Sequence, residues 1–134
     1  MEIRSISYEM TWSIRQAAMW PNESIAYVML PNDKEGSHFG LFVNDQMVSV
    51  ISIFITDGHA QFRKFATLDA EQGKGYGSKL LNHIFLELAK SEITKVWCNA
   101  RADKTDFYER FGMIQTEKRF DKGGINYVIM EKSI

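Results

Sequence analysis

The chain has 134 residues, of which 45% are hydrophobic and 25% are charged, and its 16 basic residues nearly balance its 17 acidic ones. A chain of this length suits one hydrophobic core, so we expect a single domain over residues 1–134. The near-neutral charge argues against a nucleic-acid partner or a polybasic membrane patch, and no apolar run is long enough to predict a transmembrane helix.

Cysteine usage and the N-terminus narrow the class of protein further. The single cysteine, Cys98, has no partner for an internal disulfide, and no group of cysteines and histidines has the spacing of metal ligands. The polar first residues, MEIRSISYE, do not resemble a signal peptide. We therefore expect a cytoplasmic protein that uses no metal and binds no membrane.

The N-terminal part is predicted to contain a strand and a helix. Residues 2–7 suit a short strand, and residues 8–20 suit a helix because their apolar side chains recur at helical spacing. Pro21 ends this helix. Residues 23–37 are interpreted as a short helix or turn followed by a loop.

Three antiparallel strands are predicted next, over residues 38–43, 46–55 and 59–68. Tight turns at Asn44-Asp45 and Asp57-Gly58 join them, since Asp-Gly between two apolar runs is a strong hairpin signal. Within the third strand, the apolar alternation changes phase between Phe62 and Phe65. A phase change inside a strand predicts a bulge, and bulges often lie beside ligand sites.

The C-terminal half alternates helices and strands. A glycine-rich loop precedes an amphipathic helix whose apolar stripe consists of Leu80, Leu81, Ile84, Phe85 and Leu88. The elements predicted after it are a strand over residues 95–101, a helix over 103–112 and a hairpin of 113–120 with 126–132. A strand, a crossover helix and a further strand imply a parallel pair. The predicted fold is therefore α/β, or α+β by a strict reading, with a mixed sheet.

The loop EQGKGYGSK, residues 71–79, places Gly73, Gly75 and Gly77 directly before the long helix. Glycine costs conformational entropy in an ordered segment, and it allows a ligand to approach the backbone closely. The free N–H groups of a helix N-terminus attract phosphate. The spacing fits neither the Walker A pattern nor the dinucleotide fingerprint. The loop therefore indicates an anion site, and the alternative is a loop whose glycines only permit tight turning.

The pattern Gln72-x-x-Gly75-x-Gly77 resembles the Q/R-x-x-G-x-G/A signature of the GCN5-related N-acetyltransferase (GNAT) superfamily. The likeness covers most of the chain, because the element order matches and residues 99–113 resemble the family's next strand end and helix. The resemblance implies a mixed, mostly antiparallel sheet flanked by helices, with a splayed parallel strand pair. It also implies acetyl-CoA as the acetyl donor.

The same resemblance indicates which residues bind the coenzyme. The strand end offers backbone contacts to the pantetheine arm, and the loop amides hold the pyrophosphate. Asn99 matches a position that often contacts pantetheine, although a capping or turn role is the alternative. The implied cofactor-binding residues are Phe65, Ala66, Thr67, Gln72, Gly73, Lys74, Gly75, Tyr76, Gly77, Ser78 and Asn99.

Tyr108 matches the family position that often acts as the general acid for the leaving thiolate. A phenol can donate a proton or a hydrogen bond at neutral pH. The alternative is that Tyr108 packs in the core with Phe107 and Phe111. Because Phe107 and Phe111 form the better i, i+4 pair, we expect Tyr108 to face the cleft as the catalytic residue.

No general base is evident in the sequence. Gln61 stands where some relatives have a glutamate, while His38 and His59 lie beside turns and are expected to be solvated. Deprotonation of the acceptor through water is therefore expected. Cys98 is interpreted as a small core residue and not as an acyl carrier.

The resemblance implies transfer of the acetyl group to a small-molecule or peptide amine by direct attack in a ternary complex. The alternatives are a non-catalytic acyl-CoA-binding sensor or interaction module and another type of nucleotide-phosphate binder. The acceptor pocket would lie between the first helices and the closing hairpin, where the candidates are Trp20, Glu23, Tyr27, Phe120 and Tyr127. Both a monomer and a homodimer are compatible with the sequence.

Overall fold

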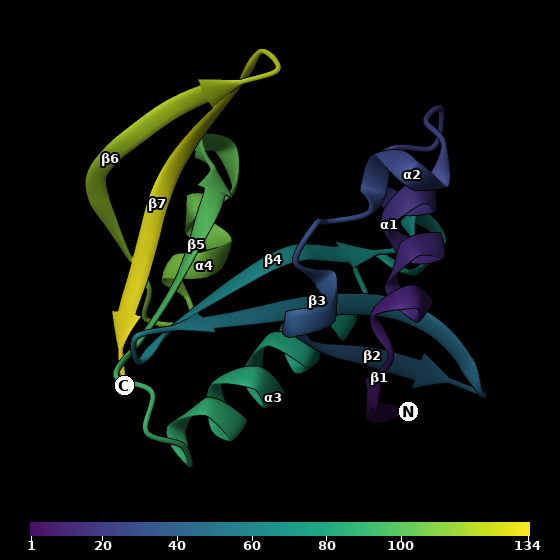
Figure 1. Ribbon diagram of the computed structural model, residues 1–134, viewed down its shortest axis with the longest axis horizontal. Coiled ribbons are helices and arrows are strands. Elements are labelled where there is room, and N and C mark those ends of the chain that lie inside the picture. The colour runs from purple at the N-terminus through teal and green to yellow at the C-terminus, as the bar shows by residue number, and fades with distance from the viewer.

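The computed structural model describes all of residues 1–134, which form a seven-stranded sheet with helices on both faces (Figure 1). The strands follow the order β1-β2-β3-β4-β5-β7-β6 across the sheet. Only β4 and β5 pair in parallel, so the predicted mixed, mostly antiparallel sheet is confirmed. The strands are Glu2–Ile6 (β1), Ser37–Val43 (β2), Gln46–Thr56 (β3), His59–Thr67 (β4), Lys95–Arg101 (β5), Ile114–Lys122 (β6) and Ile125–Ser133 (β7).

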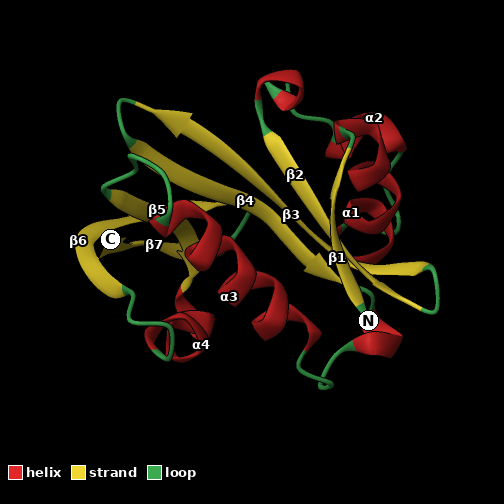
Figure 2. Ribbon diagram, turned by 90° about the horizontal axis from the view of Figure 1, so that it is seen from below, coloured by secondary structure: helices red, strands yellow, loops and turns green.

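The helices lie on opposite faces of the sheet: α3 and α4 cover one face, and α1 and α2 cover the other (Figure 2). None of them is long and apolar enough to cross a membrane. Their bounds are Trp12–Met19 (α1), Ile25–Val28 (α2), Tyr76–Ala89 (α3) and Thr105–Glu109 (α4), with short 3₁₀ turns at Tyr8–Thr11 (η1), Asp33–Glu35 (η2), Asp69–Glu71 (η3) and Ala102–Lys104 (η4).

Two predicted helices are shorter in the structure. The helix expected over residues 8–20 begins as the separate 3₁₀ turn η1 and continues as α1. The helix expected over residues 103–112 likewise splits into η4 and α4. Gly112 follows α4 with a φ of 86°, a left-handed conformation that ends the helical path and returns the chain to β6.

Apolar side chains on the two faces of the sheet form two separate clusters. The predicted stripe of α3 is buried against the inner strands, and burial of each such side chain stabilises the fold by about 1.5–3 kcal/mol. On the opposite face, Ile14 of α1 packs on Val50 and Ala66. The sheet is therefore covered on both faces next to β4, where the candidate site lies.

The predicted hairpin turns are confirmed by their backbone angles. Asn44 and Asp45 have φ values of 51° and 63°, and Asp57 and Gly58 have φ values of 52° and 77°. Left-handed conformations at both central positions match the right-handed twist of the flanking strands. These turns fix the register of β2, β3 and β4.

A buried ion pair joins α1 to the segment before β2. Arg15 donates to both oxygens of Asp33, at 2.9 Å and 3.0 Å, and both residues are almost fully buried. Arg15 also donates to the backbone carbonyl of Val28 and to Ser52 Oγ on β3. Because a buried charge needs a hydrogen-bonded partner, these contacts anchor α1 to the sheet.

Candidate active site

A cavity of about 880 Å³ opens where β4 and β5 diverge. The parallel ladder between these strands joins only residues 59–61 to residues 95–97. Beyond that ladder the strands separate, and residues from the divergent part of each strand line the cavity together with the glycine loop and α4. The splayed parallel pair that the family resemblance implied is therefore present (Figure 1).

A bulge in β4 marks the point of divergence. The register with β3 passes from Ser52 opposite Arg63 to Val50 opposite Ala66, so β4 contains one extra residue. Lys64 lies within this bulge with a φ of 52°, which is uncommon for a residue with a long side chain. The bulge predicted from the apolar phase change between Phe62 and Phe65 is confirmed, and it turns the strand toward the cavity.

The free edge of β4 faces the gap between the strands. The N–H of Leu68 bonds to the carbonyl of Val48 on β3 at 2.9 Å. Because successive amides of a strand point to opposite edges, the N–H groups of Thr67 and Phe65 are directed to the edge that β5 leaves uncovered. This edge can bond to an extended ligand as a further strand would.

The glycine loop places several free amides at one end of the cavity. Lys79 N–H makes the first bond of α3, to the carbonyl of Gly75, so the amides of Tyr76, Gly77 and Ser78 have no carbonyl one turn earlier. Gly73 and Gly75 adopt φ values of 79° and 82°. No acidic residue lies in the first turn of α3. The loop therefore presents unpaired donors and a positive helix end to an anion.

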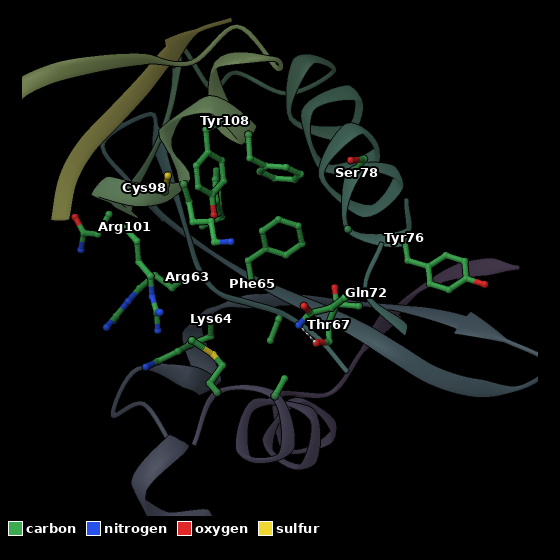
Figure 3. A pocket seen from close by; sticks show the side chains of 18 of the residues that line it. Arg63, Lys64, Phe65, Thr67, Gln72, Tyr76, Ser78, Cys98, Arg101 and Tyr108 are labelled. Atoms are coloured by element: carbon green, nitrogen blue, oxygen red, sulfur yellow. Dashed lines mark hydrogen bonds between the residues drawn. The ribbon is translucent and has the colours of Figure 1, made fainter. Parts of the chain in front are cut away.

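The space beside the glycine loop is open enough for a bound pyrophosphate. A Cβ atom added at Gly73 or Gly75 would meet no atom within 4 Å, so both positions border open space. At Gly77 an added Cβ would come within 3.3 Å of the Phe65 ring, so this glycine permits close packing of α3 on β4. Gln72 Nε2 donates to the carbonyl of Thr67 at 3.2 Å and ties the loop to the strand end (Figure 3). The residues present fit a coenzyme pyrophosphate.

The structure brings together the sequence-predicted cofactor residues with one exception. Lys74 does not line the cavity, because its amine pairs with Glu71 at 3.0 Å on the exposed side of the loop. The ring of Tyr76 points away from the cavity, so only its backbone faces the site (Figure 3). The members that line the cavity are Phe65, Ala66, Thr67, Gln72, Gly73, Gly75, Tyr76, Gly77, Ser78 and Asn99.

Tyr108 projects from α4 with its hydroxyl directed into the cavity (Figure 3). Its ring packs on Phe62 and Phe107, with centroids 5.8 Å and 5.2 Å away. Burial, reinforced by the neighbouring Cys98, raises the pKa of Tyr108 above its usual value. The phenol therefore stays protonated at neutral pH and is a hydrogen-bond donor within the cavity.

Cys98 lies beside Tyr108 on β5 and is buried. Burial raises the pKa of its thiol to about 12. Because the thiolate is the reactive form of cysteine, this thiol is inert at neutral pH. The interpretation of Cys98 as a core residue agrees with its place among the buried apolar side chains.

A group of basic side chains at the opposite end of the cavity was not predicted from the sequence. Arg63 and Lys64 come from the bulge of β4 and Arg101 comes from the end of β5, and the three gather on one side (Figure 3). We call this group the cationic end of the cavity, and the segment Gln72–Ser78 the loop end. In the sequence, a single charged residue within an apolar strand looks like an ordinary solvated side chain. No local pattern links residues 63 and 64 to residue 101.

Only part of the predicted acceptor region reaches the cavity. Trp20 and Tyr127 line it, whereas Glu23, Tyr27 and Phe120 do not. Tyr27 packs edge-on against Trp20 with centroids 5.1 Å apart, and Phe120 stacks on Tyr127 at the same separation. The two aromatic pairs therefore support the wall of the cavity from α1 and from β7.

The residues considered as general bases lie elsewhere. The expectation that His38 is solvated is wrong, because it is buried, with Nδ1 2.7 Å from Ser52 Oγ and Nε2 2.8 Å from the carbonyl of Asp33. Gln61 and His59 do not line the cavity. Glu71 is the one carboxylate in the lining, and it lies at the loop end in its pair with Lys74.

The chain matches the acetyltransferase (GNAT) domain family over residues 11–134. It is 33% identical to an uncharacterized N-acetyltransferase of Bacillus subtilis (strain 168), YitI, in an alignment that covers all of this chain and 97% of that protein. The chain therefore belongs to the GNAT acetyltransferase family, as its glycine motif and element order indicated.

Solved structures share this fold at low sequence identity. A putative N-acetyltransferase from Lactobacillus plantarum superposes with a TM-score of 0.88 at 20% identity, covering 98% of this chain and 97% of that chain. A GNAT family acetyltransferase from Elizabethkingia anophelis, solved with acetyl-CoA bound, has a TM-score of 0.75 at 13% identity, covering 99% and 97% of the two chains.

Proposed function

We propose that the protein transfers the acetyl group of acetyl-CoA to a primary amine by direct attack in a ternary complex. The observation that carries this proposal is the continuous cavity that joins the loop end, the free edge of β4 and the hydroxyl of Tyr108. Membership in the GNAT family and the acetyl-CoA bound to a neighbour of the same fold support the same donor.

The donor side of the proposed site is made by the loop and β4. The amides of Tyr76, Gly77 and Ser78 donate hydrogen bonds to the pyrophosphate at the N-terminus of α3. The outward N–H groups of Phe65 and Thr67 align the pantetheine arm along β4, and Asn99 lies on the facing strand. Both strands thus orient the thioester before it reacts, which lowers the entropic part of the barrier.

When bound, acetyl-CoA supplies a thioester carbonyl: the neutral amine attacks its carbon, the C–S bond breaks, and the proton that the amine loses ends on the coenzyme A sulfur, so that the products are the acetylated amine and free coenzyme A thiol. The role of this chain is to stabilise the charges that develop. Backbone N–H groups of β4 beside the cavity would stabilise the carbonyl oxyanion.

Tyr108 is the proposed catalytic residue. Its raised pKa keeps the phenol protonated, so it donates a hydrogen bond to the sulfur as negative charge develops there. The packing of its ring on Phe62 and Phe107 fixes its direction without a polar partner. A donor with no competing acceptor is free to bond to the leaving group.

The proposed site deprotonates the acceptor through water. An ordinary lysine-type amine has a pKa of about 10.4, so most of it is protonated at neutral pH. The carboxylate of Glu71 is at the loop end and is neutralised by Lys74. Because neither His38 nor His59 lines the cavity, no side chain stands out as the base.

The test is an assay of free coenzyme A thiol released from acetyl-CoA in the presence of a panel of amines. We expect thiol release that depends on the amine and a product that mass spectrometry identifies as the acetylated amine. If acetyl-CoA binds but no member of a broad panel is acetylated, the protein is instead a non-catalytic acyl-CoA-binding module. If acetyl-CoA does not bind at millimolar concentration, the proposal fails entirely.

A further inference from the structure

The charge of the cavity lining is strongly one-sided. Its five cationic residues are Arg63, Lys64, Arg101, Lys104 and Arg110, and its one acidic residue is Glu71, already paired with Lys74. None of the five cations forms a salt bridge. The chain as a whole is nearly neutral, so the excess of positive charge is a local property of this cavity.

Three of these cations share the cationic end, away from the glycine loop. Arg63 lies opposite Ser52 in the ladder, and Ser52 Oγ accepts a bond from Arg15 beneath α1. Residues opposite each other share a face of the sheet, so Arg63 lies on the face that α1 covers. Arg101 lies opposite Tyr127 of β7, which also lines the cavity.

The cationic end is a costly arrangement for the protein by itself. Arg63 and Lys64 are half-buried, and burial lowers the pKa of each, with neighbouring positive charges adding to the effect. The carboxylate that favours the charge on Arg63 is Asp33, and both of its oxygens are bonded to Arg15. Unpaired cations held together in a cavity indicate a site that gains its counter-charge from a ligand.

The coenzyme phosphates do not account for the cationic end. The loop end already offers backbone donors to the pyrophosphate, and it lies across the cavity from Arg63, Lys64 and Arg101 (Figure 3). Lys104 ends η4 and Arg110 directly follows α4, the helix on the face that α3 also covers. The three cations of the cationic end therefore remain for the acceptor.

We propose that the acceptor is an amine that also carries a carboxylate or phosphate group, bound by Arg63 and Arg101 at the cationic end. This inference rests on the proposed acetyl transfer and names the class of its acceptor. The planar guanidinium groups can bond to two oxygens of such an anion at once. The same positive field disfavours the ammonium form of the incoming amine, which assists its deprotonation in a cavity without a nearby base.

The experiment compares matched acceptors with the wild-type protein and acetyl-CoA. The panel contains short ω-amino carboxylates, phosphate esters of amino alcohols and plain alkylamines of equal chain length. We expect kcat/KM for the carboxylate or the phosphate series to exceed that of the alkylamines on the order of tenfold or more. The comparison between the two anionic series shows which anion the site prefers.

Variants separate the cationic end from the coenzyme site. Arg63→Gln and Arg101→Gln should raise KM for the anionic acceptor on the order of tenfold and leave KM for acetyl-CoA within about twofold. Arg101 is exposed, so its variant keeps the fold even if that of Arg63 does not. The matched control is Arg119→Gln, since Arg119 is exposed on β6, bonds to Gln115 and does not line the cavity.

Each outcome decides the inference separately from the acetyl transfer. The inference is overturned if kcat/KM for the alkylamines equals or exceeds that for the anionic amines, or if both variants change KM for acetyl-CoA alone. Either result leaves the proposed acetyl transfer standing. If no amine is acetylated, calorimetry with desulfo-coenzyme A present measures binding of the same anionic amines. Binding that Arg101→Gln weakens supports the cationic end as an anion site although transfer fails, and absence of binding overturns it.

Discussion

The loop end of the cavity presents mainly backbone N–H groups, whereas the cationic end presents side chains from two strands. The loop end is built from consecutive residues, and its glycines are required by backbone angles and close packing. The cationic end is assembled from residues 63, 64 and 101, which meet only because β4 and β5 are neighbours. The difference teaches that a backbone site leaves a pattern in the sequence, while a side-chain site depends on tertiary structure.

The largest expected effect concerns the buried ion pair of Arg15 and Asp33, which we call the anchor and which attaches α1 to the sheet on the face where Arg63 lies. Asp33→Asn leaves the Arg15 guanidinium buried without its counter-charge, so it should lower the free energy of unfolding by about 3–5 kcal/mol. Chemical denaturation measures this change. Asp45→Asn is the matched control, because Asp45 pairs with Arg4 on the open surface and its loss should leave the denaturation midpoint unchanged. Equal effects of both changes would contradict a special role for the buried pair.

The second prediction tests the proposed hydrogen bond from the Tyr108 hydroxyl to the leaving sulfur. Tyr108→Phe removes only the hydroxyl, so kcat and kcat/KM should fall together by about 100-fold while the Kd of coenzyme A stays nearly the same. Steady-state kinetics and calorimetry measure the two quantities. Tyr8→Phe is the control, since Tyr8 packs on Trp12 outside the cavity. Wild-type turnover of the Tyr108 variant would remove this residue from the mechanism.

The loop end is tested by a pair of glycine substitutions. Gly75→Ala and Gly58→Ala both introduce a Cβ at a positive φ, so each should destabilise the fold by about 1–2 kcal/mol. Only Gly75 borders the cavity, so only its variant should weaken binding of acetyl-CoA, on the order of tenfold. A similar loss of affinity in both variants, measured by calorimetry, would show that the effect comes from general instability.

The smallest expected effect is the change in the free energy of unfolding at low pH that comes from Asp33. Burial acts to raise the pKa of Asp33, but the bonds from Arg15, from Leu30 N–H and from Trp12 together outweigh it and lower that pKa. The stability from this carboxylate is therefore present above the ordinary value near 3.8 and is lost as the pH falls through the lower folded-state pKa. Unfolding free energies across this range should fall more steeply with acid for wild type than for Asp33→Asn, and parallel curves would contradict the expectation.

The sequence predicted the order of the elements, the hairpin turns and the bulge, because each depends on local chemistry. Asp57-Gly58 supports a left-handed turn, and the apolar phase change around Phe62 requires an extra residue in β4. The glycine pattern likewise predicted the loop end. These features need no knowledge of which strands become neighbours.

Contacts between segments that are distant in the sequence could not be predicted from sequence patterns. His38 was interpreted as solvated because it follows a loop, yet Ser52 on the neighbouring strand makes it a buried hydrogen-bonded residue. Arg15 and Asp33 are separated by a helix and a loop, and neither has a local partner that marks the pair. The three residues of the cationic end were missed for the same reason.

The position of Arg15 in α1 separates the residue that holds the helix from the residues that line the cavity. The anchor lies one helical turn before Ala18, Met19 and Trp20, which form the wall of the cavity on that side. Substitutions at the wall can therefore reshape the pocket without touching the bonds that attach the helix to the sheet. Directed evolution aimed at new amines should start from these three positions and keep the arginine.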